Sequence, residues 1–396
     1  MNKALLLIPS VLKTGVDAEA AADRHPVMDY YALADALRLK HGMTVDLLDF
    51  AAAEADTSAA VRMARKVGGP DAALAVMGYQ RRREYRAIFT NGENVGIPLA
   101  LLLGGAASRL NHVTIGHRLS TGKKQLFFTK LNVQKRMDTI FLYADAQREW
   151  ATNQLHIAPE KLRLIPFHAD AKFYRPLPEI SADPNQICAA GLEWRDYPTL
   201  IDAVASLPDL SVKLAAASPW SKHENETAGR VLPPNIDARR YSYAELRELY
   251  ARSSFVVVPL KETDFQAGVT TILEAMAMGK AVIATRTTGQ TDVITDGENG
   301  LSVAPGDAAG WREAIVRLRG DPAHRERLGR NGRRWVEENA TLNLWASRVA
   351  ASISGSAAAC LAKEKNSSMS APHLAWFMHY MFPKNAFGFI NKKTRI

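Results

Sequence analysis

Long hydrophobic runs are missing from this chain of 396 residues. No apolar stretch reaches the roughly 18 residues that a membrane-spanning helix needs. The first apolar run, ALLLIPSVL at 4–12, is shorter and lacks a small-residue cleavage site, so it predicts a buried strand rather than a signal peptide. Cysteine is scarce too, and Cys188 and Cys360 lie far apart, in no metal or redox spacing. We therefore expect a protein of the reducing cytoplasm.

Several binding motifs are also missing. The net charge of +9 suits anionic partners such as nucleotides, phosphates, nucleic acids or an anionic membrane face. Zinc-finger spacing, RNP-like motifs and basic zippers do not occur, so we expect no nucleic-acid partner. The segment PSVLKTG after the first strand has a single glycine, which argues against a dinucleotide-dependent dehydrogenase. Strand ends carry no Asp-x-Asp motif, so we expect no bound metal.

Strand and helix signals alternate along the first half of the chain. Strand-like segments are KALLLIP, MTVDLLDF, RAIFT, HVTIGH, DTIFLYA and LRLIPF. Helical spacing appears between them, for example in DYYALADALRLKHG, which ends at Gly42, and in IPLALLL. Such alternation is typical of a parallel sheet in an α/β domain.

A second alternating region follows a proline-rich connection that contains Pro166, Pro176 and Pro184. It runs through QICAAG, YPTLIDAVASL, SVKLAAAS, YAELRELYARS, FVVVPL and KAVIAT. We predict two doubly wound domains, at 1–176 and 177–340, followed by a return helix and an aromatic, basic tail at 341–396. Ligands of such domains bind at the carboxyl ends of the strands, here in the cleft between the domains.

The stretch FQAGVTTILEAMAMGK places Glu274 one turn into an apolar helix. Gly268 would let the backbone approach a ligand closely. Thr270 or Thr271 would cap the helix, whose N–H groups and dipole would face an anion. Glu274 could then accept two hydrogen bonds from a vicinal diol such as a ribose, or it could be a structural carboxylate of a buried helix. The loop TRTTGQTDV predicts a second helix start, suited to a diphosphate.

Residues 270–307 read TTILEAMAMGKAVIATRTTGQTDVITDGENGLSVAPGD. This segment resembles the C-terminal signature of family-four glycosyltransferases of the GT-B fold, which are also called glycosyl transferases group 1. The segments VTIGHRLS, LIPFHADAKFYRP, AAGLEWRDYPTLIDAV and YSYAELRELYARSSFVVVPL resemble further parts of these enzymes, in the same order. The resemblance covers about 1–354. It implies two Rossmann-like domains facing across a cleft, with C-terminal helices returning to the first domain. The first domain would take the acceptor and the second the nucleotide-sugar donor.

The resemblance implies a role for individual residues. Glu274 matches the glutamate that holds the donor's ribose, Arg195 falls on a lysine that contacts the diphosphate, and His117 matches a histidine that faces the donor sugar. Further donor contacts would come from Gln266, Ala267, Gly268, Val269, Thr270 and Tyr243. Gly15, Asn91 and Glu93 are candidate contacts to the acceptor or the sugar.

Two positions depart from the family pattern. Gln266 stands where the first glutamate of the pair is expected, and Leu192 stands where an arginine would contact phosphate. Glutamine can bind sugar hydroxyls but carries no negative charge, and Glu262 or Asp264 nearby are candidate substitutes. These departures keep open a degenerate module that binds nucleotide sugar without turnover, beside a nucleotide-sugar epimerase of the same fold.

The implied reaction is sugar transfer with retention, in which the departing phosphate takes the acceptor's proton and the protein supplies positioning and charge. The nucleotide-diphosphate sugar is the donor substrate, and we expect no cofactor and no metal. A glycan, a lipid-linked glycan or a small molecule would be the acceptor.

Two segments suggest peripheral attachment to the inner face of a membrane. GKKQLFFTKLNVQKR, at Gly122–Arg136, mixes lysines with apolar residues and could lie on an anionic membrane. An ordinary helix that packs Phe127 and Leu131 inward explains it slightly better. The aromatic tail segment WFMHYMF, Trp376–Phe382, adds weight to the membrane interpretation.

Overall fold

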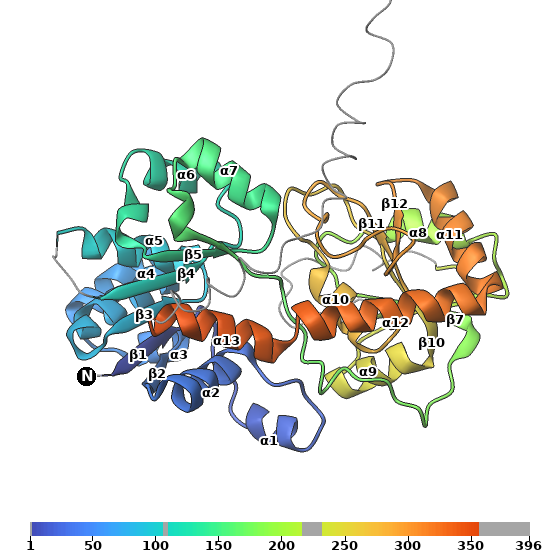
Figure 1. Cartoon of the computed structure of the whole chain (residues 1–396), viewed down its shortest axis with the longest axis horizontal. Helices are drawn as coiled ribbons and strands as arrows, with labels where there is room; N and C mark the ends of the chain where they lie inside the picture. Colours follow the sequence, from blue (N-terminus) through green and yellow to red (C-terminus); the bar gives the residue numbers. More distant parts are fainter. Residues whose placement is uncertain (1, 106–109, 216–231, 356–396) are drawn as a thin grey trace, which may run out of the picture. The chain divides into compact units, whose positions relative to one another are not determined.

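The computed structural model describes residues 2–105, 110–215 and 232–355 (Figure 1). The chain up to Ser354 forms one compact unit. The predicted membrane-binding tail segment Trp376–Phe382 lies outside the described residues. Among the described helices, none combines the length and the apolar character that crossing a membrane requires.

The first sheet has six parallel strands in the order β2-β1-β3-β4-β5-β6. Two of its strands, Ala87–Thr90 and Thr139–Leu142, are buried along their whole length, because helices cover both faces. The strands are β1 Lys3–Leu7, β2 Thr44–Leu48, β3 Ala87–Thr90, β4 Asn111–Ile115, β5 Thr139–Leu142 and β6 Leu162–Leu164. The helices are α1 Val16–Ala21, α2 Asp29–His41, α3 Phe50–Ala55, α4 Ala59–Arg81, α5 Glu93–Leu102, α6 Gly122–Thr129 and α7 Asp145–Leu155, with short 3-10 turns η1 Arg82–Glu84, η2 Leu103–Gly105, η3 Val133–Arg136 and η4 Pro159–Lys161.

The second sheet also has six parallel strands, in the order β12-β11-β10-β7-β8-β9. Its strands are β7 Asp183–Ala190, β8 Ser211–Ala215, β9 Ile236–Arg239, β10 Ser253–Val258, β11 Val282–Thr285 and β12 Leu301–Val303. Its helices are α8 Tyr197–Val204, α9 Tyr243–Arg252, α10 Val269–Ala277, α11 Ala308–Gly320 and α12 Pro322–Asn339. The prediction of two α/β domains with parallel sheets is confirmed.

The last described helix, α13 at Leu342–Ile353, belongs to the core of the first sheet although it follows the second. It packs against α2, as Figure 1 shows in orange-red beside dark blue. Its buried Trp345 joins Leu33 and Phe89 in one hydrophobic cluster. The chain thus returns to its first domain, as predicted.

Ion pairs connect the two sheets within this unit. Asp23, in the loop between α1 and α2, binds Arg175 at 2.7 Å and Arg247 of α9 at 2.9 Å. The two guanidinium groups hold the pKa of Asp23 well below its usual range. Arg118, after β4, binds Asp264, after β10, at 2.9 Å. The Arg118–Asp264 pair joins two loops at the carboxyl ends of strands, where ligands of such sheets bind.

Candidate functional site

The N-terminus of α10 is open to a ligand. Gly268 precedes the helix with φ of 70°, and no side chain of the described residues caps it. A Cβ on Gly268 would lie 2.9 Å from both Leu260 and Val258, so both the conformation and the space require glycine. The predicted cap at Thr270 or Thr271 is wrong, because this left-handed turn starts the helix at Val269. The first-turn N–H groups remain available to an anion.

Arg195 lies against the start of α10. The side chain is buried, and its guanidinium donates to the carbonyls of Ala190 at 2.8 Å and Glu193 at 3.0 Å and to Thr271 Oγ1 at 3.1 Å. A guanidinium has five N–H groups, so two remain for a ligand. Burial lowers the pKa of Arg195, but arginine stays charged. The β7–α8 loop therefore presents a fixed cation beside an open helix N-terminus.

The Glu274 side chain is buried within the second domain. Its Oε2 accepts a hydrogen bond from the Tyr250 hydroxyl at 3.0 Å. The Tyr174 hydroxyl lies nearby but forms no hydrogen bond with the described residues. Burial and the neighbouring Glu274 together raise the pKa of Tyr174 well above its usual value. Burial raises the pKa of Glu274 to about 7, although Tyr250 and the Arg195 charge oppose this rise. The Glu274 carboxyl group thus keeps its proton to higher pH than an exposed glutamate does.

Buried polar atoms without partners surround the loop before α10. Gln266 Oε1, Gln290 Oε1 and Thr287 Oγ1 are all buried and have no hydrogen-bond partner in the described structure. Gln290 is fixed through its Nε2, which donates to the Ala267 carbonyl at 3.0 Å. Leaving such atoms unpaired costs about 1–3 kcal/mol each. Three of them at one place indicate a polar ligand site.

The loop that carries Gln290 is locked to the loop that carries Gln266. Gly289 donates its N–H to the Thr263 carbonyl at 2.8 Å, and a Cβ at this glycine would collide with the backbone of Phe265. The predicted second helix start in this loop is wrong, because 286–299 form turns rather than a helix. The proposed diphosphate site therefore has one helix N-terminus, not two.

His117 lies at the start of the loop after β4, and Glu93 holds that loop in place. Glu93 accepts from the backbone N–H groups of His117 at 2.8 Å and Arg118 at 3.2 Å, and from Lys124 Nζ at 2.5 Å. Burial alone would raise the pKa of Glu93, but Lys124 and His117 together lower it. The His117 side chain is exposed to solvent. The protein atoms packed around it still displace part of its water, and this desolvation lowers the pKa of His117. Glu93 thus acts on His117 through the backbone.

Part of the second domain resembles a known family in sequence. Residues 184–321 match the sequence model described as glycosyl transferases group 1. An uncharacterized glycosyltransferase of Methanocaldococcus jannaschii is 32% identical over 140 residues, which are 35% of this chain and 39% of that protein. A lipopolysaccharide core biosynthesis glycosyltransferase of Rhizobium meliloti is 30% identical over 158 residues, 38% of this chain and 44% of that protein. The aligned region therefore spans less than half of either relative.

Solved structures of glycosyltransferases share the fold over most of the chain. Sucrose-phosphate synthase from Thermosynechococcus elongatus superimposes with a TM-score of 0.68 and 18% identity, covering 91% of this chain and all of that one. Anabaena HepE in complex with UDP-glucose gives a TM-score of 0.64 and 17% identity, covering 89% and 99%. These likenesses identify the fold as GT-B, as the sequence predicted.

Asn91 and Tyr243, which were also predicted from the group 1 resemblance, have protein partners. Asn91 donates to Asp29 at 3.3 Å, and the Tyr243 ring packs on His25 with centroids 4.3 Å apart. Gly15 adopts φ of 83° before α1, with open space where a side chain would be. No comparison tests these three residues as contacts, so they stay predictions.

The candidate substitutes for the missing glutamate are engaged elsewhere. Glu262 is exposed and accepts the Thr288 N–H at 2.8 Å, whereas Asp264 binds Arg118 and Ser120. Neither carboxylate lies buried beside Gln266. The sequence did not single out Tyr250, Thr287 or Gln290 either. The glycine in TRTTGQTDV marked the loop that carries Thr287 and Gln290, but no local signal distinguishes polar residues that lack partners.

Proposed function

We propose that this protein is a retaining glycosyltransferase that moves a sugar from a nucleotide-diphosphate sugar to a hydroxyl group of a glycan, a lipid-linked glycan or a small molecule. One observation carries the proposal: an uncapped helix N-terminus, a buried arginine with two spare N–H groups and three buried unpaired polar atoms converge at one place. Anions and hydroxyl groups are the ligands that such a set would bind. The UDP-glucose complex of HepE supports a nucleotide sugar as that ligand.

Each part of the site would meet one part of the donor. The first-turn amides of α10 and Arg195 would bind the diphosphate and stabilise it as it leaves. Glu274 would accept hydrogen bonds from the ribose, and Gln266 with His117 would bind the sugar's hydroxyl groups. The amide of Gln266 can both donate and accept, so loss of the family glutamate changes the contact without removing it.

The reaction needs no separate protein base. The bond between the anomeric carbon and the diphosphate oxygen breaks, and the acceptor oxygen bonds to that carbon on the same face. The acceptor's proton passes to the departing phosphate oxygen, and a nucleoside diphosphate leaves. Positioning and a fixed cation are what this chain would contribute, which makes a metal unnecessary in this proposal.

A binding module without turnover is the second candidate, and the neutral Gln266 favours it. Thermal stabilisation with UDP-, GDP- and ADP-sugars, followed by assay of sugar release, separates the two. A ligand at a hundred times its dissociation constant adds about 2.7 kcal/mol to the unfolding free energy. Stabilisation with slow sugar release supports the enzyme, and stabilisation without release, even with a pool of cell-extract acceptors, supports the module.

We also propose peripheral attachment to an anionic membrane through α6 and the turn after it. Leu126 and Leu131 are 58% and 57% exposed, next to the exposed Lys123 and Lys130. The expectation that Leu131 packs inward is wrong, whereas Phe127 does pack against the first domain's core. Exposed leucines flanked by lysines suit an anionic interface. Cosedimentation with phosphatidylglycerol vesicles at low salt should be lost in the Leu126→Ser/Leu131→Ser variant, and equal binding of both proteins would refute the attachment.

A further inference from the structure

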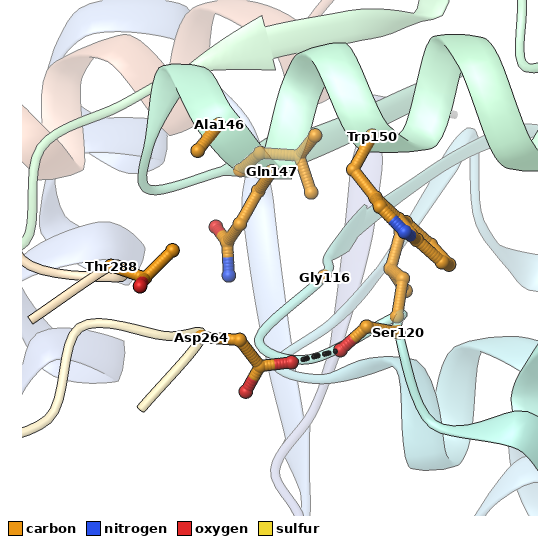
Figure 2. A pocket seen from close by; sticks show the side chains of 9 residues that line it. Gly116, Ser120, Ala146, Gln147, Trp150, Asp264 and Thr288 are labelled. Atoms are coloured by element: carbon orange, nitrogen blue, oxygen red, sulfur yellow. Dashed lines mark hydrogen bonds between the residues drawn. The ribbon is translucent and has the colours of Figure 1, made fainter. Parts of the chain in front are cut away.

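A cavity of about 260 Å³ lies beside the His117 loop, within the compact unit. Residues of the β4–α6 loop, of α7 and of the end of β5 form most of its wall. Asp264 and Thr288, from loops of the second sheet, complete it (Figure 2). None of the donor contacts predicted from the family resemblance lines it. The cavity is thus a neighbour of the proposed donor site and is built mainly by the first domain.

Gln147 connects this cavity to His117. Its Nε2 donates to the His117 carbonyl at 2.9 Å, and its Oε1 accepts the Tyr143 N–H at 3.1 Å. Figure 2 shows the Gln147 amide reaching from α7 into the space between Gly116 and Thr288. The amide is held by two backbone groups and still has one N–H and one lone pair for a ligand. A molecule that binds the Gln147 amide is therefore connected to the His117 loop through this one side chain.

The cavity is electrically neutral. Asp264 Oδ1 accepts from the Arg118 guanidinium at 2.9 Å, and Oδ2 accepts from the Ser120 hydroxyl at 2.9 Å. The guanidinium offsets the carboxylate charge while unused lone pairs remain for hydroxyl donors. Lysine, arginine and histidine are absent from its described lining. A phosphate or carboxylate placed here would lose water without gaining a cation.

Trp150 gives the cavity a flat apolar wall. The indole is partly exposed and packs with one side against the core cluster of the first domain. Leu119 and Leu142 extend the apolar surface, and Figure 2 shows Trp150 across the cavity from Thr288. Sugar rings have an apolar face of C–H groups and a rim of hydroxyl groups. An aromatic wall with fixed donors and acceptors around it matches both features.

We propose that this cavity is the acceptor subsite and that it holds one neutral sugar ring of a glycan. The proposal rests on the proposed glycosyltransferase function and names the acceptor class that the function leaves open. The ring stacks on Trp150, and its hydroxyl groups bind Gln147, Asp264 and Thr288. The volume lies below the range of about 300–1,000 Å³ of pockets for drug-sized ligands, so a single ring is accommodated. Phosphorylated sugars should bind more weakly, because no cationic side chain is among the described residues that line the cavity.

The test uses neutral methyl glycosides and charged sugar phosphates as probes. Methyl α-D-glucopyranoside, methyl α-D-galactopyranoside and methyl α-D-mannopyranoside are compared with glucose 6-phosphate and mannose 6-phosphate, by saturation-transfer NMR on the full chain with and without nucleoside diphosphate. At least one neutral glycoside should bind, and the phosphates should bind more weakly. Trp150→Ala should weaken that binding about tenfold, whereas Trp150→Phe, which keeps an aromatic face, should retain most of it.

Nucleotide calorimetry on the same samples separates this proposal from the proposed function. Unchanged nucleoside diphosphate affinity in both Trp150 variants shows that the fold and the donor site are intact. Tighter binding of the phosphates, or equal glycoside binding by wild type and Trp150→Ala, overturns the subsite while donor binding still stands. Failure of every nucleoside diphosphate to bind wild type overturns the proposed function, and the subsite with it.

Discussion

Replacement of Glu274 by glutamine should stabilise the protein above neutral pH while it weakens nucleotide binding. Glu274 is buried and its pKa is raised from 4.5 to about 7, chiefly by loss of water. A pKa difference of one unit corresponds to 1.36 kcal/mol, so the ionised Glu274 carboxylate destabilises the folded protein by about 3 kcal/mol at alkaline pH. Glutamine removes the charge and keeps an oxygen for the Tyr250 hydroxyl.

The pH dependence follows from the sign of the shift. The unfolded chain releases the Glu274 proton near pH 4.5, whereas the folded protein holds it until about pH 7. The stabilisation by the protonated form is therefore present below pH 4.5 and is lost between pH 4.5 and 7. The free energy of unfolding of Glu274→Gln should therefore exceed that of wild type by an amount that grows across this window, to about 3 kcal/mol at pH 8. Loss of the attraction between Glu274 and Arg195 reduces this difference.

Urea unfolding of both proteins at pH 5 and pH 8 measures this difference. Glu248→Gln is the matched control, because Glu248 is exposed on α9 and should leave the difference unchanged at both pH values. Nucleotide calorimetry at pH 8 should show weaker binding by Glu274→Gln, since the ribose loses its carboxylate acceptor. A Glu274→Gln variant that is equally destabilised at both pH values would refute the account of a strained, buried carboxylate.

Three further predictions concern stability and the His117 loop. Gly268→Ala should lower the free energy of unfolding in urea by about 2 kcal/mol, because alanine is strained at φ of 70°. Gly320→Ala is the control and should lower it far less, because Gly320 has open space around it and no such strain. His112 is fully buried, and its pKa is lowered from 6.5 to about 4. The free energy of unfolding of wild type should therefore fall by up to about 3 kcal/mol as pH falls through this window. A His112→Gln variant whose stability falls with the same pH slope would contradict this. Glu93→Gln should reduce sugar transfer without changing nucleotide affinity in calorimetry, because Glu93 orients the His117 backbone; unchanged transfer would count against that role.

The presence of two parallel sheets was predictable because their strands are short apolar runs between amphipathic helices. All residues of β10 are buried, as its run of apolar residues indicates. The long helix α4 was missed. Gly69 and Pro70 interrupt its pattern, and the chain passes this point through a kink with φ of 73° at Gly69. The segment labelled α4 is thus two helices joined at a kink, and the glycine and proline at the junction hid both of them in the sequence pattern.

The candidate site was predictable where the residues follow strand ends. Arg195, His117 and Gln266 all follow strands of parallel sheets, and such ends converge at one edge. The surroundings of Glu274 were not predictable, because Tyr250 lies 24 residues away on another helix. The role of Glu93 was missed for the same reason, since its partner His117 follows the neighbouring strand. Such contacts depend on tertiary placement, which periodicity does not contain.

Calorimetric titration with UDP, GDP and ADP tests the central claim most directly, that the N-terminus of α10 and Arg195 bind a nucleoside diphosphate. At least one should bind wild type, and Arg195→Gln should weaken it more than tenfold, because a buried charged hydrogen bond is worth about 1.5–3 kcal/mol. Arg252→Gln, at an exposed arginine of α9, should bind as wild type does. Absence of binding by all three nucleotides, or equal affinity of wild type and Arg195→Gln, would contradict the account.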